Sequence, residues 1–184
     1  MMRKNAALFV VIAFTLLTPV RGAAPAAEVP VKVSGAIAQP SDWTATRLKS
    51  EFAAQIKPIE YTSHGQKHTA NCVSLLAVLK HCGVPLEIKT GPAADPKTKN
   101  LPLRLAVVVR ASDGYAATLS LAELMPDFGN KEAWLAMDMD GKSLSEKDGP
   151  LKLIVPSDGK TGRWVHGITE IVVLDAATSS EPKP

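Results

Sequence analysis

Hydrophobic and polar residues alternate in short runs along most of the chain, which is the pattern of β-strands with one buried face. Pairs such as His64-Gly65 and Asp113-Gly114 separate neighbouring runs and predict tight hairpin turns. Because strands dominate without regular βαβ alternation, we predict a single α+β domain with mixed or antiparallel sheets and short helices. The expected strands are residues 31–37, 59–63, 67–72, 103–110, 115–119, 134–139 and 151–155, with a last strand or strand pair at 164–174.

Three short segments between these runs favour helices. Residues 74–81 place their apolar side chains on one face and end before Gly83, which suits a helix C-terminus. Either Asp42 or Thr46 is expected to cap a short helix that follows the first strand. Residues 120–123 read Ser-Leu-Ala-Glu, the spacing of a capping box, and predict a third short helix.

The N-terminus has the pattern of a secretory signal peptide. Arg3 and Lys4 precede an uncharged, mostly apolar run at 6–17, which is too short to span a membrane comfortably. Small residues follow this run, so we assign 1–22 to the signal and expect cleavage somewhere between positions 22 and 27. The alternative is an uncleaved membrane anchor. Cleavage would make the protein periplasmic or secreted.

The remainder predicts one folded domain at residues 28–175, followed by a polar, proline-containing tail at 176–184 that we expect to be disordered. No second apolar run of spanning length follows the signal, so no membrane span is expected after cleavage. The signal also lacks an Arg-Arg pair before its apolar run, which indicates export as an unfolded chain. A cofactor made in the cytoplasm could not easily travel with such a chain.

Charge excludes one class of partner. The whole chain has 21 basic and 18 acidic residues, and removing residues 1–22 takes away three basic residues and no acidic ones. The domain that remains is formally neutral and has no electrostatic footprint for nucleic acid.

The two cysteines, Cys72 and Cys82, are predicted to be unpaired. Export would permit a disulfide, but the helix expected at residues 74–81 lies between them. A mostly helical connection holds the two Cα atoms roughly 12–15 Å apart. A disulfide needs a separation below about 7 Å, so both thiols are expected to act as small core side chains.

Three potential metal ligands, His64, His68 and Cys72, stand four residues apart. The turn expected at Gly65 separates the two histidines, so we interpret them as exposed hairpin residues and expect no metal site. No nucleophile elbow, zinc-protease helix or dinucleotide fingerprint is present.

The second half of the chain carries three informative phrases in order: Asp113-Gly114-Tyr115, DGPLKLIVP at residues 148–156 and GRWVHGITEI at 162–171. The first half adds VSGAI at 33–37, and LLAVL at 75–79 followed by Cys-Gly-Val. In this order and spacing, the phrases resemble the oxidoreductase molybdopterin-binding domain family over about residues 31–174. The resemblance implies that the α+β domain has the sulfite-oxidase-type fold.

The resemblance also implies a molybdopterin cofactor, whose molybdenum is bound by a cysteine thiolate in the family's enzymes. Residues 59–62 occupy the corresponding region here, and they contain no cysteine. Cys72 comes later, where family members often have glycine. The segment that helps to cradle the pterin in the enzymes is also short in this chain.

By the same resemblance, Arg163 and His166 stand where the enzymes carry two basic residues that approach the pterin phosphate. Arg163 has a permanent charge and a planar set of donors. His166 would be charged only at mildly acidic pH. These two are our candidate residues for a cofactor or another anion. The alternative is that Arg163 covers Trp164 at the surface and that His166 is an ordinary half-buried residue.

Two classes of function follow. The first is a secreted, non-catalytic scaffold that binds a small anionic ligand or a periplasmic protein, with no cofactor, catalytic residue or metal. The alternative is a molybdopterin-dependent oxidoreductase of the sulfite oxidase type. The missing cysteine and the type of signal favour the first class.

Overall fold

The computed structural model describes residues 28–178, and its content of short helices and mixed sheets confirms the α+β prediction. The helices are α1 (Ala45–Glu51), α2 (Leu75–His81) and α3 (Leu121–Leu124), with 3₁₀ turns η1 (Ala53–Gln55), η2 (Leu101–Arg104) and η3 (Thr161–Arg163). The strands are β1 (Val31–Gly35), β2 (Ser41–Trp43), β3 (Lys57–Ser63), β4 (Gln66–Ser74), β5 (Leu105–Ala111), β6 (Ala116–Ser120), β7 (Trp134–Ala136), β8 (Asp138–Met139), β9 (Lys142–Ser143), β10 (Lys152–Ile154) and β11 (Ile168–Asp175).

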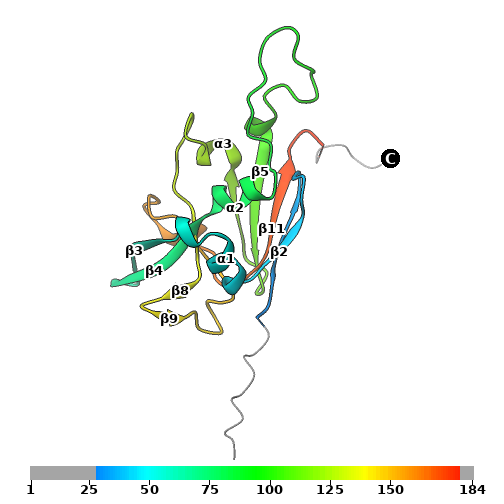
Figure 1. The fold of residues 1–184 in the computed structure, drawn as a ribbon. Helices are drawn as coiled ribbons and strands as arrows, with labels where there is room; N and C mark the ends of the chain where they lie inside the picture. The colour runs from blue at the N-terminus through cyan, green and yellow to red at the C-terminus, as the bar shows by residue number, and fades with distance from the viewer. Residues whose placement is uncertain (1–27, 179–184) are drawn as a thin grey trace, which may run out of the picture.

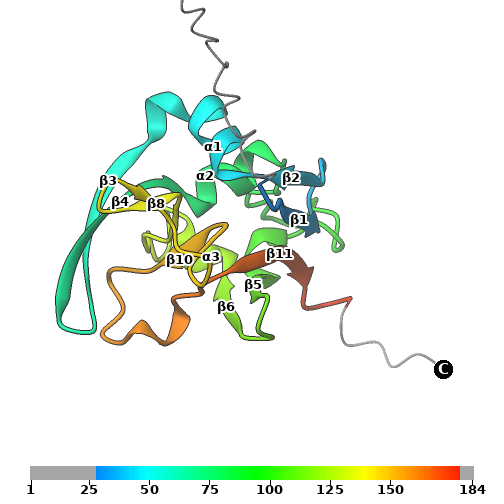
Figure 2. The same cartoon turned by 90° about the horizontal axis from the view of Figure 1, so that it is seen from below.

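Two main sheets form the domain (Figure 1). The five-stranded sheet has the order β2-β1-β11-β5-β6, in which β1 and β11 are parallel and the other pairs antiparallel. The four-stranded sheet has the order β10-β7-β4-β3 and is antiparallel throughout. The β3–β4 hairpin extends away from the rest of the domain in both views, which makes it the most prominent projection near the site described below (Figure 2).

Alternation of apolar residues builds the core, as the sequence pattern predicts. In β5 the side chains of Leu105, Val107 and Val109 are buried, whereas those between them are more accessible. Helix α2 buries Leu75, Val78 and Leu79, which lie on one helical face. Leu135, Leu151, Leu153, Ile154, Ile168 and Ile171 are among the other fully buried residues.

Two local predictions are confirmed in detail. His64 and Gly65 have φ angles of 50° and 78°, which identifies the two-residue turn of the β3–β4 hairpin. Helix α3 begins with a capping box in which Ser120 and Glu123 bond each other's backbone N–H groups. Both signals are local, since each depends on residues no more than three positions apart.

Most strand ends shift by one or two residues from the prediction, and three differences change the structural interpretation. Asp42 lies in β2, so the cap of α1 is Thr44, whose Oγ1 accepts a hydrogen bond of 3.1 Å from Arg47 N. Residues 134–139 divide into β7 and β8, which belong to different sheets. The last strand begins at Ile168, because Gly167 adopts a left-handed φ of 57° that ends the extended segment before it.

Cys72 and Cys82 are both free and buried, which confirms that they are unpaired. Cys72 lies in β4 and Cys82 caps the C-terminus of α2, so the connection between them is part strand and part helix.

The predicted signal peptide lies outside the described residues. Ala176 and Thr178, which we assigned to a disordered tail, make backbone hydrogen bonds to Arg104 and Asp175; residues 179–184 lie outside the described part. Between residues 28 and 178, no helix is long and apolar enough to cross a membrane.

Candidate functional site

A cluster of aromatic and charged side chains lies where the β3–β4 hairpin meets the C-terminal part of the chain. We call it the Tyr61 cluster, and it contains Tyr61, His68, Asp148, Lys152, Trp164 and His166. Its aromatic part comes from three segments. Tyr61 on β3 lies opposite His68 on β4, with ring centroids 5.5 Å apart, and the Trp164 ring packs edge-on against Tyr61 at 5.4 Å.

Backbone hydrogen bonds hold the segment after η3 in place. Gly167 N donates to Asp148 O at 3.0 Å, and Leu153 N donates to Val165 O at 2.8 Å. The indole Nε1 of Trp164 donates to Val155 O at 3.0 Å. These bonds fix Trp164 and His166 beside β10, although neither residue lies in a regular strand.

Lys152 brings a buried positive charge into the cluster. Only 3% of the residue is exposed, and its Nζ lies 5.4 Å from the centroid of the Tyr61 ring. In the sheet, Lys152 pairs with Ala136, which in turn pairs with Cys72. Strands β7 and β4 lie between β10 and β3, so the contact between Lys152 and Tyr61 joins the two edges of this sheet.

Asp148 is the counter-charge of this lysine and the centre of a small polar network. Its Oδ1 lies 3.4 Å from Lys152 Nζ and is hydrogen-bonded to Nδ1 of His166, while Oδ2 accepts a bond of 2.7 Å from Ser145 Oγ. Burial alone would raise the pKa of Asp148. The bonds from Ser145 and His166, together with the charge of Lys152, outweigh burial and hold this pKa below its usual value.

Tyr61 and Cys72 both favour their neutral forms. Burial, followed by the negative charges of Asp148 and Asp140, raises the pKa of Tyr61 to about 12. Burial and then Asp138 raise the pKa of Cys72 to about 12, and its thiol donates to Ala70 O. The phenol Oη of Tyr61 is buried, and it has no hydrogen-bond partner in the described part of the chain.

Arg163 and His166, the residues predicted to bind an anion, each contact carboxylates. Arg163 Nε and Nη2 donate to the two oxygens of Asp158 at 2.8 and 2.6 Å, and Nη1 donates to Glu123 Oε1 at 3.0 Å. These bonds raise the pKa of Arg163, and they hold the pKa of Asp158 below its usual value. His166 contacts Asp148 instead, so the structure gives the two candidates separate partners.

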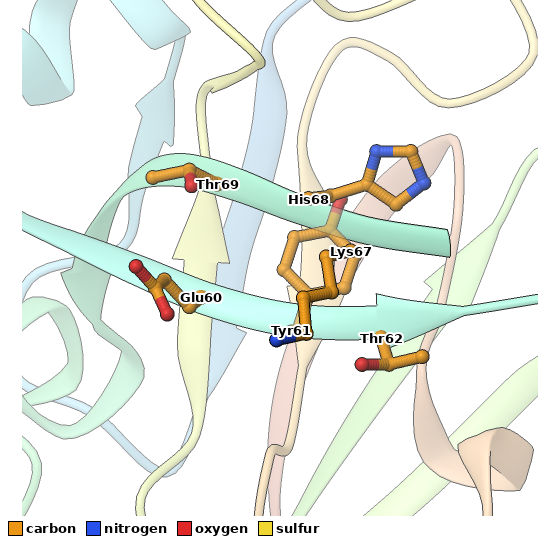
Figure 3. Close-up of a pocket in the computed structure, with 6 residues that line it drawn as sticks. All are labelled: Glu60, Tyr61, Thr62, Lys67, His68 and Thr69. Carbon is orange, nitrogen blue, oxygen red and sulfur yellow. The ribbon is translucent and has the colours of Figure 1, made fainter. Parts of the chain in front are cut away.

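Two open depressions border the cluster, and Tyr61 lines both. The first, of about 440 Å³, lies on the hairpin and is lined by Glu60, Tyr61, Thr62, Lys67, His68 and Thr69 (Figure 3). The second, of about 390 Å³, lies between β3 and the segment from Pro156 to Trp164. A further depression of about 590 Å³ beside α1 and the loop before Pro150 shares no lining residue with either.

Sequence reasoning missed the central pair of this cluster. Asp148 and Lys152 lie in the phrase DGPLKLIVP, which carries part of the family resemblance, but nothing in the phrase shows that its lysine is buried. The one available signal was a lysine inside an otherwise apolar run. Of the three suggested metal ligands, His68 bonds Asp140 at 2.8 Å and Cys72 is buried. Residues 28–178 contain no group of three His, Cys, Asp or Glu side chains that could hold a metal ion.

Comparison with known families agrees with this architecture. The chain matches the oxidoreductase molybdopterin binding domain family over residues 18–181, which is nearly its whole length. The protein therefore belongs to this family, as the sequence phrases indicated. A search of curated proteins found no match.

Proposed function

We propose that this protein is a non-catalytic member of its family that is exported to the periplasm or secreted. In this proposal the scaffold binds a small molecule or a protein instead of carrying out molybdenum chemistry. Family membership alone favours the alternative, a molybdopterin-dependent oxidoreductase, but a shared fold does not fix function.

The observation that carries the proposal is the set of side chains near Tyr61 that could act as ligands to molybdenum. Molybdenum in this family is expected to need a soft, deprotonated sulfur ligand. The region of the expected thiolate, residues 59–62, offers the buried Tyr61, whose pKa of about 12 keeps the phenol neutral. Cys72 is fully buried, and its thiol is held protonated in the same way. These residues do not fit a molybdenum centre.

The charges in the Tyr61 cluster and at the neighbouring Arg163 support the same conclusion. Arg163 already forms ion pairs with Asp158 and Glu123, and Lys152 forms one with Asp148. A pterin phosphate at this place would meet cations that are neutralised and carboxylates that repel it. Binding it would require several ion pairs to separate.

We expect protein isolated from a host that makes molybdopterin to contain only background molybdenum. The reason is the lack of an accessible thiolate near Tyr61. Elemental mass spectrometry of the purified protein measures the molybdenum content, and an active member of the family prepared in parallel controls for cofactor supply. About one molybdenum atom per chain would refute the proposal and favour the oxidoreductase.

Anion binding at Arg163 and His166 stays a prediction, and it can be tested directly. We expect sulfate to bind weakly, because it has to displace a carboxylate from Arg163. A charge-assisted hydrogen bond contributes about 1.5–3 kcal/mol, so Arg163→Ala should weaken this binding a further ten- to hundredfold.

Calorimetric titration with sulfate and with a phosphorylated pterin analogue measures these affinities. Lys160→Ala is a matched control, because it removes an exposed cation nearby that has no ion pair in the described structure. Identical heats for the wild type and Arg163→Ala would show that Arg163 is part of the scaffold only.

A further inference from the structure

Strand β3 has a free edge. It is the last strand of its sheet, and its pairing partner is β4; along residues 57–63 the described structure contains no backbone hydrogen bond on the other side. Unpaired strand edges readily accept another strand, and natural proteins usually cover or blunt them. In both views the hairpin that carries this edge projects from the domain (Figures 1 and 2), and Pro58, Glu60 and Thr62 along the edge are exposed.

The hairpin turn determines which groups point outward from this edge. The two-residue turn at His64-Gly65 makes Ser63 and Gln66 the hydrogen-bonded pair that closes the hairpin. Hydrogen-bonding direction alternates along an antiparallel strand. The N–H and C=O groups of Glu60 and Thr62 therefore point away from β4, as does the C=O of Pro58. Because Pro58 lacks an N–H, it ends the usable edge, which leaves a short stretch centred on residues 60–62.

A groove lies along this stretch. The 390 Å³ depression has Glu60, Tyr61 and Thr62 on one wall and the segment around Lys160 on the other. Three consecutive residues line the first wall, although successive side chains of a strand point to opposite faces. The groove is therefore bordered by the strand's backbone as well as by its side chains. An occupant of this groove would therefore lie beside residues 60–62 of the edge.

Charge argues for a partner other than a second copy of the chain. Glu60 is exposed and has no ion pair in the described structure. Antiparallel pairing of two β3 strands centred on Glu60 would place this residue opposite itself, and like charges directly opposite are unfavourable. Pairing centred on Tyr61 would place Glu60 opposite Thr62, where it gains no opposite charge. A partner strand with a basic side chain at that position would instead form a favourable cross-strand pair.

The opposite wall adds a second constraint. The Asp158 carboxylate is neutralised by Lys131 and Arg163, whereas the exposed Lys160 beside it has no ion pair in the part of the chain described. The occupant should therefore carry an acidic side chain toward this wall. A single extended segment can present a basic residue to one side and an acidic residue to the other, since its side chains alternate.

We propose that β3 and the segment 156–161 form a docking groove for an extended peptide segment of a partner protein, which adds to the sheet as a fifth strand. The partner's peptide lacks proline at the positions that pair with β3, and it has a basic residue opposite Glu60. This mode of recognition uses backbone hydrogen bonds for affinity and side-chain pairs for specificity. The inference rests on the proposed binding function and names the class of partner.

A library of linear twelve-residue peptides displayed on phage serves as the probe, selected against the folded protein. We expect the selected peptides to share a basic residue for Glu60 and an acidic residue for Lys160, and to be poor in proline. Thr62→Pro removes an outward N–H without removing a bond to β4, and it should weaken binding at least tenfold. Thr118→Pro makes the same change at an outward position of β6, the edge strand of the other sheet, and should leave binding unchanged.

Two further measurements keep the test independent of variant stability. A selected peptide that is N-methylated at the positions facing β3 should lose its affinity for the unmodified protein. Glu60→Lys should reduce the affinity of the basic peptides at least tenfold. Failure to select any peptide, or equal binding to the wild type and a folded Thr62→Pro, would overturn the groove. So would a dimer in light scattering that Thr62→Pro dissociates.

The molybdenum measurement separates this inference from the function on which it rests. Molybdenum-free protein that binds no peptide refutes only the groove. Stoichiometric molybdenum refutes the binding-module proposal, whatever the peptides do.

Discussion

Replacing Asp148 with alanine is expected to lower the free energy of unfolding by about 3–5 kcal/mol, the usual cost of breaking a buried ion pair from one side. The change leaves Lys152, which is 3% exposed, without its counter-charge. It also removes an acceptor from Ser145 and His166. Urea unfolding followed by circular dichroism measures the loss.

Removing the lysine instead provides the matched control. Lys152→Met keeps the apolar stem and leaves Asp148 with its bonds from Ser145 and His166, so it should cost less than Asp148→Ala. The double variant should be more stable than Asp148→Ala alone, because no charge is then left unpaired. Strictly additive losses in the double variant would mean that the two side chains act independently.

The contribution of Asp148 to the free energy of unfolding should also depend on pH. Its folded-state pKa lies below its usual value, so its contribution is fully present above the unfolded pKa of about 3.9. That contribution is lost as pH falls through the folded pKa. The difference in stability between the wild type and Asp148→Ala should therefore shrink below about pH 4, and a constant difference down to pH 2 would contradict this account.

Gly35→Ala is expected to destabilise the fold by about 4 kcal/mol or more, a size that is rare for a point mutation. Gly35 has a φ of 99°, and a Cβ on it would lie 2.1 Å from the carbonyl oxygen of Val173. The two residues are register partners in the β1–β11 pair, so relief of the clash would require the parallel strands to separate. Thermal unfolding of the variant measures the effect.

Gly114→Ala separates the contribution of backbone conformation from that of the clash. Gly114 has a similar φ of 87°, but nothing lies within 4 Å of an added Cβ. It should cost only about 1–2 kcal/mol, the usual penalty for a left-handed conformation. If both variants lost the same stability, close contact between β1 and β11 would not explain the need for Gly35.

Features with local signals could be predicted from the sequence. The turn at His64-Gly65, the capping box from Ser120 to Glu123 and the amphipathic helix α2 each depend on a few neighbouring residues, and all are confirmed. The cap of α1 was assigned wrongly, because β2 extends to Trp43 through its pairing with β1. That pairing is a contact between segments and leaves no signal at Asp42 itself.

The candidate site was harder to predict, because its contacts join distant parts of the chain. Tyr61 and Lys152 are brought together although β7 and β4 lie between their strands in the sheet, and no local pattern in the sequence indicates this contact. The family resemblance identified Arg163 as a candidate residue for binding an anion. Its bonds to Asp158 and Glu123 depend on where η3 and α3 lie in the fold, which the sequence pattern does not specify.

The central position of β11 has a consequence for the order of folding. Its two neighbours, β1 and β5, do not pair with each other, so the first strand can join the sheet only after the last has been synthesised. The pairing of Lys32 with Glu170 closes most of the described chain into one loop, and contacts of such separation form slowly. A nascent chain that stops before Ile168 would leave the β1–β2 ribbon detached from β5 and β6. The five-stranded sheet therefore cannot be completed until residues 168–175 have been synthesised, however early the local hairpins form.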